Sequence, residues 1–177
     1  MAITSEQVKE LRDRTQAGFL ECRNALAETG GDVSRAVEIL RERGLAKAEK
    51  KASRPVGEGR VESYVHTTNK MAVLVELNCE TDFVARNDAF IQLARDIALH
   101  IAAMNPQFLR KEDVREEALQ ADETTNTPEE FYEKYVLLEQ PFVRDESVTI
   151  GQKIQETIAK TGENIVLRRF VRYEVGA

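Results

Sequence analysis

An alternation of apolar and polar residues, followed by a long segment with apolar residues at helical spacing, limits the fold of this chain more than any other sequence feature. Apolar and polar residues alternate over residues 60–79, and the turn at residues 68–70 interrupts the alternation, which is typical of a β-hairpin. Over residues 87–104, apolar side chains recur three or four positions apart, as one face of an amphipathic helix requires. The two features together predict an α+β fold in which helices cover an antiparallel sheet.

The C-terminal part of the sequence supplies a third strand for this sheet. Residues 163–175 read ENIVLRRFVRYEV, with the spacing of a strand. We predict that one face of it carries Ile165, Leu167, Val171 and Tyr173, and the other Val166, Arg168, Phe170 and Arg172. Further helices are predicted from Pro128 to near Pro141 and over residues 147–160, and a short one is possible over residues 111–119.

Residues 4–44 predict three short helices around a small core. Thr4 and Gln7 have the spacing of a capping box, and residues 15–18 and the pair Gly30-Gly31 break the helical pattern. We expect the inner faces to carry Phe19, Cys22 and Leu26 in the second helix, and Val33, Ala36, Val37 and Leu40 in the third, which Asp32 would cap.

The composition changes after residue 45. A basic cluster is followed by chain-breaking residues: Lys47, Lys50, Lys51, Arg54, then Pro55, Gly57, Gly59. We therefore divide the chain into a helical domain over residues 1–45, a basic helix tail and linker over 46–59, and a core over 60–177. The basic cluster suits either contact with RNA or an acidic partner, or a solvated helix end, and the acidic excess of the whole chain favours the solvated helix end.

Composition excludes several classes of protein. The chain has 177 residues, 25 of them basic and 31 acidic, for a net charge of −6, so we expect no direct binding of nucleic acid. No apolar run approaches the roughly 18 residues of a membrane span, and the N-terminus lacks the apolar core of a signal peptide. Cys22 and Cys79 lie far apart and form no metal or redox motif. A cytoplasmic protein without membrane contact is the simplest expectation.

Catalytic and cofactor motifs are absent from the sequence. It contains neither a glycine-rich phosphate loop nor a nucleophile elbow. His66 and His100 are the only histidines, and neither has companions at a metal-binding spacing. We expect no catalytic residue, no metal and no cofactor, and therefore an interaction protein and not an enzyme.

The stretch NCETDFVARND, residues 78–88, joins the predicted hairpin to the long helix and leaves one question open. If the helix began at Thr81, Phe83 would join its buried stripe. If it begins at Asn87, Phe83 protrudes between strand and helix, with charged residues around it. Such an arrangement is typical of an apolar anchor at a protein interface.

The same stretch resembles the signature of the bacterial elongation factor Ts family, the nucleotide exchange factors for the GTPase EF-Tu. LRDRTQAGFLECRNAL resembles the N-terminal motif of the family, and LLEQPFVRDE and GENIVLRRFVRYEVG resemble its C-terminal part. The similarity is spread along essentially the whole chain. One departure is the pair Phe19-Leu20, where many members have two methionines, although both residues remain apolar.

The resemblance implies a role for the turn between hairpin and helix. In the family, the Phe of this motif inserts into the G domain of GDP-bound EF-Tu, displaces the elements that hold Mg²⁺ and phosphates, and leaves the partner nucleotide-free. The resemblance assigns this role to Phe83, with Asp82 as its companion. Thr81, Val84 and Arg86 would form the frame around it.

The resemblance also implies a UBA-like N-terminal domain that docks on the same G domain through Leu11, Phe19, Leu20 and Arg23. Long family members carry two related core halves, whereas this chain has one hairpin, one TDFV motif and one closing strand. We therefore expect a short form that pairs as a homodimer and forms a complex of two factors with two EF-Tu molecules.

The main alternative function is a ribosome- or RNA-associated adaptor. It would use the basic cluster of residues 47–54 together with Arg168, Arg169 and Arg172. A ubiquitin-like binding module, inferred from the N-terminal helices alone, is a weaker alternative, because such small folds carry many functions.

Overall fold

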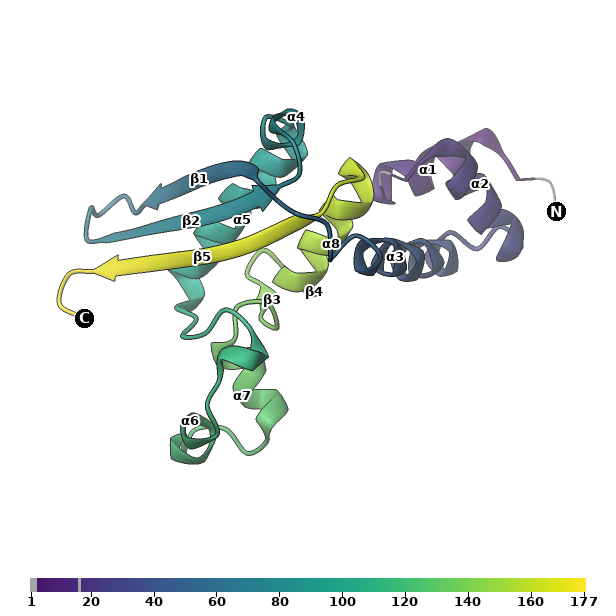
Figure 1. The fold of residues 1–177 in the computed structure, drawn as a ribbon. Coiled ribbons are helices and arrows are strands. Elements are labelled where there is room, and N and C mark those ends of the chain that lie inside the picture. The colour runs from purple at the N-terminus through teal and green to yellow at the C-terminus, as the bar shows by residue number, and fades with distance from the viewer. Residues whose placement is uncertain (1–2, 16) are drawn as a thin grey trace.

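The computed structural model describes residues 3–15 and 17–177, and its elements are labelled in Figure 1. In chain order they are α1 (Ser5–Thr15), α2 (Phe19–Glu28), α3 (Val33–Glu49), β1 (Glu58–Val65), β2 (Met71–Cys79), α4 (Asp82–Ala85), α5 (Asp88–Met104), the 3₁₀ helix η1 (Lys111–Asp113), α6 (Glu116–Ala121), α7 (Pro128–Tyr135), β3 (Pro141–Phe142), β4 (Asp145–Thr149), α8 (Ile150–Thr161) and β5 (Ile165–Glu174).

The centre of the fold is an antiparallel sheet in the order β1-β2-β5, which confirms the α+β prediction. Helix α5 packs across β1 and β2, and α8 lies beside α5 on the same side of the sheet (Figure 1). The inner residues of β2, such as Val73, Val75 and Leu77, are buried under these helices. The opposite face of the sheet has no helix on it among the described residues.

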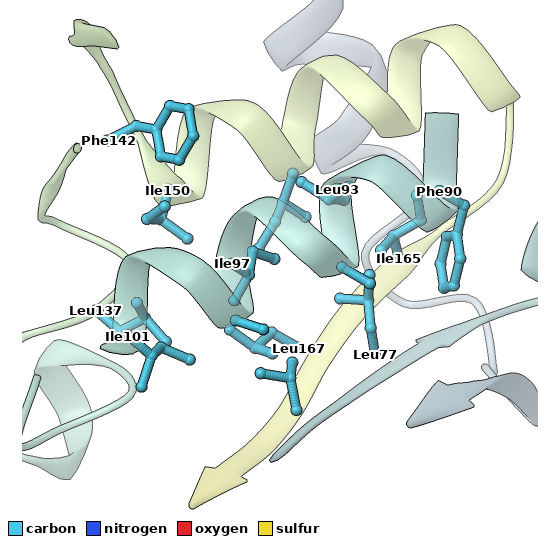
Figure 2. Close-up of a cluster of buried hydrophobic side chains, with 14 of the residues drawn as sticks. Leu77, Phe90, Leu93, Ile97, Ile101, Leu137, Phe142, Ile150, Ile165 and Leu167 are labelled. Carbon is cyan, nitrogen blue, oxygen red and sulfur yellow. The ribbon is translucent and has the colours of Figure 1, made fainter. Parts of the chain in front are cut away.

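The main core lies between the sheet and the helices α5 and α8 (Figure 2). All six apolar positions predicted for the long helix are buried: Phe90, Leu93, Ala94, Ile97, Ala98 and Ile101. Figure 2 shows Ile97 and Ile101 with Leu137 and Ile150, which come from more distant parts of the chain. Each fully buried side chain of this size stabilises the fold by about 1.5–3 kcal/mol.

The N-terminal helices α1, α2 and α3 enclose a separate, smaller core. Thr4 and Gln7 form the predicted capping box, and the Asp32 carboxylate accepts a hydrogen bond from the Arg35 amide at 3.0 Å. Of the predicted break at residues 15–18, Gln16 lies outside the described residues. The UBA-like character of these helices and the division of the chain at residues 45 and 60 remain predictions.

One side chain of α2 does not lie where the sequence pattern predicts. Cys22, Ala25 and Leu26 face the small core, but Phe19 is 58% exposed. Phe19 is the first residue of its helix, directly after the N-cap Gly18, and so has no neighbouring turn to pack against. The prediction that it lines the inner face is therefore wrong.

The predicted faces of the third strand are also wrong beyond Leu167. The register of β5 against β2 shifts between Glu76 and Leu77, whose partners are Arg169 and Leu167, so Arg168 is the extra residue of a bulge. A bulge exchanges the faces of the residues that follow it. Phe170 therefore packs against the core with Leu167, whereas Val171 and Tyr173 lie on the open face.

The segment between α5 and α8 contains a small hairpin, β3–β4, that sequence reasoning missed. The last predicted helix begins three residues later than expected, because Ser147 lies in β4 and Thr149 caps α8. The Thr149 hydroxyl accepts a hydrogen bond from the Gln152 amide at 3.2 Å, and the Gln152 side chain completes a capping box.

His100 attaches this segment to α5. Its ring is fully buried; Nδ1 accepts a hydrogen bond from the Val143 amide at 3.2 Å, and Nε2 lies 2.9 Å from Oε1 of Gln140. An Nδ1 acceptor requires the neutral ring with its proton on Nε2, which then donates to Gln140. Burial lowers the pKa of His100, in agreement with this neutral form.

No helix in residues 3–15 and 17–177 combines the length and the apolar composition needed to cross a membrane.

Candidate partner-binding site

The one-turn helix α4 separates two neighbouring side chains. Val84 is 8% exposed and belongs to the main core, whereas Phe83 is 83% exposed. Successive residues of a helix are about 100° apart around its axis, so a single turn can bury one side chain and present the next to solvent. Burial of Val84 thus fixes the turn on the core and leaves the Phe83 ring outside it.

The start of the long helix decides between the two alternatives for Phe83. Helix α5 begins at Asp88, and the side chain of its N-cap Asn87 accepts a hydrogen bond from the Ala89 amide at 2.8 Å. The chain therefore breaks between α4 and α5, and Phe83 is not part of the buried stripe that begins at Phe90. Phe83 protrudes.

Two charged side chains flank the exposed ring. The Asp82 carboxylate at the start of α4 and the guanidinium of its C-cap residue Arg86 form an ion pair at 3.0 Å, and both are solvent-accessible. Such a surface pair contributes only about 0.3–0.5 kcal/mol. The pair places one negative and one positive charge beside the exposed ring, an arrangement typical of the polar rim around an apolar contact.

Thr81, at the N-terminus of α4, is held by a residue that sequence reasoning did not single out. The Glu163 carboxylate accepts hydrogen bonds from the Thr81 amide at 3.0 Å and from the Thr81 hydroxyl at 2.6 Å. The two residues are 82 positions apart in sequence, so no local sequence pattern predicts their contact. Pairing of β5 with β2 brings them together, since Cys79 lies opposite Ile165.

The thiol of Cys79 supports the same turn. Its sulfur donates to the Thr81 carbonyl at 3.1 Å, and burial raises the pKa of Cys79 to about 11. The thiol is therefore protonated at neutral pH. A nucleophilic cysteine would be a thiolate, so Cys79 contributes packing and not reactivity.

Three of the four residues predicted to dock the N-terminal domain on a partner are exposed on α2. Phe19 and Leu20 are exposed, Leu20 by 63%, and Arg23 is exposed on the same helix. Leu11 is fully buried in the small core, so the prediction that it contacts a partner is corrected. Leu11 supports the surface from within.

Four of the seven cations that the alternative RNA-binding function would use are paired with carboxylates. The pairs are Lys47 with Glu21, Arg54 with Glu80 at 3.4 Å, Arg169 with Glu76 at 2.6 Å, and Arg172 with Glu174 at 2.7 Å. A cation already paired with a carboxylate has less charge to offer a phosphate backbone. These contacts reduce the support for an RNA-associated adaptor.

In the part of the chain that the structure describes, no three His, Cys, Asp or Glu side chains are placed to hold a metal ion. The fold and the site define an α+β protein that presents an exposed aromatic ring beside its core, a feature typical of proteins that bind other proteins.

Comparisons with known proteins agree with this class. The sequence profile of the family described as Elongation factor TS matches residues 33–130. Elongation factor Ts of Herpetosiphon aurantiacus is 51% identical, with all of both chains covered. That of Thermodesulfovibrio yellowstonii is 48% identical over 99% of this chain and 98% of its own, and that of Coprothermobacter proteolyticus is 48% identical over 99% and 100%. The chain belongs to the elongation factor Ts family, the nucleotide exchange factors of translation elongation.

Proposed function

We propose that this protein binds EF-Tu in its GDP-bound state, inserts the Phe83 ring into the G domain, disrupts the binding of Mg²⁺ and phosphates there, and so releases GDP. The observation that carries the proposal is the 83% exposure of Phe83 on a turn whose other side is fixed in the core. Asp82 and Arg86 would form the rim of this contact. No step of this kind requires a reactive group on the factor itself, so we propose that the protein is not an enzyme.

The available binding energy limits what one ring can do. Burial of a Phe side chain contributes about 1.5–3 kcal/mol. Each 1.4 kcal/mol corresponds to about a tenfold change in affinity, so Phe83 alone accounts for about a 10- to 100-fold loss of GDP affinity. A larger loss requires further contacts, and we propose that Phe19, Leu20 and Arg23 on α2 supply part of them on the same G domain.

We further propose a homodimer that uses the open face of the sheet. Five apolar side chains of the three strands are exposed there: Val61, Val65, Leu74, Val171 and Tyr173. The strand register makes them contiguous, since Leu74 lies opposite Val171, and Ala72 lies opposite both Val65 and Tyr173. A contiguous apolar patch on a sheet face is typical of an interface.

A second copy of the chain is the occupant that we propose for this face. The chain contains one copy each of the β1–β2 hairpin, the TDFV motif and the closing strand β5, whereas long relatives carry two related core halves. Two copies related by a twofold axis would bring identical faces together. The complex would then hold two factors and two EF-Tu molecules in the cytoplasm, where translation takes place.

The exchange activity can be tested by following the release of labelled GDP from EF-Tu. We expect strong acceleration by the wild-type protein and much weaker acceleration by Phe83→Ala. Val143→Ala is a matched control, because Val143 is also an exposed apolar residue but lies outside both predicted contact surfaces. Equal rates for wild type and Phe83→Ala would remove the ring from the mechanism.

A further inference from the structure

The loop between α8 and β5 holds the turn that carries Phe83. Gly162 ends α8 in the left-handed region, with φ of 80°, and Glu163 follows it. The two carboxylate oxygens of Glu163 bind both donors of Thr81, its amide at 3.0 Å and its hydroxyl at 2.6 Å. Hydrogen bonds to an ionised carboxylate are roughly twice as strong as neutral ones. Thr81 is therefore fixed two residues before the exposed ring.

Glu163 replaces the capping interaction that α4 lacks. A Thr at an N-cap normally accepts a hydrogen bond from the first turn of its helix. The Thr81 side chain makes no such bond, and its hydroxyl donates to Glu163 instead. With four residues, α4 cannot hold its own orientation, which depends on Val84 in the core and on Glu163 at its start.

Asn164, the next residue of the loop, connects the same turn to the N-terminal part of the chain. Its amide donates to the Glu80 carboxylate at 2.6 Å. Its side-chain amide, in a residue only 2% exposed, donates to the carbonyls of Ala52 at 3.3 Å and Arg54 at 2.8 Å. Ala52 and Arg54 belong to the segment that leaves α3, so one loop holds both the turn and the linker.

We propose that Glu163 is a positioning residue for nucleotide exchange. It sets the direction in which Phe83 leaves the core, while Asn164 sets where the N-terminal helices are attached relative to that ring. The inference rests on the proposed insertion of Phe83. An anchor held in its bound geometry before contact uses more of its binding energy at the target site, because less is lost in ordering.

The test is a double-mutant cycle on GDP release from EF-Tu. Glu163→Ala in the wild-type background is expected to lower the maximal rate, at saturating factor, by about tenfold, and to change the half-saturating concentration little. A tenfold change corresponds to about 1.4 kcal/mol. In a Phe83→Ala background, the same Glu163→Ala change is expected to have no further effect, because the ring that it positions is absent.

Two further variants separate positioning from general damage. Thr81→Val removes only the hydroxyl donor and keeps the shape of the side chain, so we expect a smaller loss in the same direction. Glu130→Ala is the matched control, because the Glu130 carboxylate also holds a turn, through the Asn126 amide at 2.7 Å and the Asn126 side chain at 3.2 Å. We expect it to leave the exchange rate unchanged.

The outcomes distinguish this inference from the proposed function. A loss with Glu163→Ala that disappears in the Phe83→Ala background supports the positioning role. An equal loss in both backgrounds, or no loss while Phe83→Ala is impaired, overturns it and leaves the proposed function intact. Full activity of Phe83→Ala itself overturns both.

Discussion

Phe83 and Val84 are adjacent in sequence and have opposite environments. Val84 packs with the main core, and Phe83 lies almost entirely in solvent. The sequence alone could not assign these environments, because either residue fits the apolar side of a short helix. The assignment depended on the capping of α5 by Asn87, which stops the long helix before it can absorb the turn.

The two neighbours are therefore expected to respond differently to truncation. Val84→Ala removes buried methyl groups and should lower the free energy of unfolding by about 1–3 kcal/mol. Phe83→Ala removes a side chain without core contacts and should change it by less than about 0.5 kcal/mol. Urea denaturation of both variants measures this difference. A large loss of stability in Phe83→Ala would mean that the ring belongs to the core.

At the scale of elements, the parts that could be predicted from sequence are those with local signals. The hairpin, the long amphipathic helix and the N-terminal capping box all depend on residues close in sequence, and all are observed. The bulge at Arg168, the hairpin β3–β4 and the contact of Glu163 with Thr81 depend on partners far along the chain. Strand pairing and tertiary packing decide such features, and no local periodicity encodes them.

His100, which attaches the hairpin β3–β4 to α5, should make the free energy of unfolding depend on pH. Because the pKa of the buried His100 is lowered in the folded protein, no stability depends on its charge above the unfolded value of about 6.5. Below that value the unfolded chain takes up a proton that the folded chain excludes, so stability falls by up to about 1.4 kcal/mol per pH unit until the folded pKa is reached.

The measurement is the free energy of unfolding between pH 7.5 and 5.5 for wild type and for His100→Gln. Protonation of His100 would also remove the acceptor for the Val143 amide. We expect a shallower dependence in the variant, which lacks the titrating group. Parallel curves for the two proteins would contradict a buried neutral His100.

At the scale of the whole molecule, two separate surfaces are proposed to bind two different partners. The open face of the sheet would bind a second copy, and the exposed residues of α2 and α4 would bind EF-Tu. Leu74 lies on the first surface and Leu20 on the second, and both are exposed. A charge introduced at either position leaves the cores untouched and should act only on its own interface.

Leu74→Glu should therefore convert the dimer into a monomer, and Leu20→Glu should weaken binding to EF-Tu while the dimer persists. Size-exclusion chromatography with light scattering at micromolar concentration measures the oligomeric state of each variant. A wild-type protein that is a stable monomer under these conditions would refute the dimer.

We propose that the Phe83 ring couples binding of the factor to loss of GDP. Such coupling is reciprocal: the factor lowers the affinity of EF-Tu for GDP, and GDP lowers the affinity of EF-Tu for the factor by the same ratio. The factor must therefore bind nucleotide-free EF-Tu more tightly than GDP-bound EF-Tu by that ratio. Calorimetric titration of both forms gives this ratio directly. We predict that Phe83→Ala lowers the ratio by about 10- to 100-fold, which is the change in affinity expected from burying one Phe side chain. An unchanged ratio would mean that the Phe83 ring does not couple factor binding to GDP release.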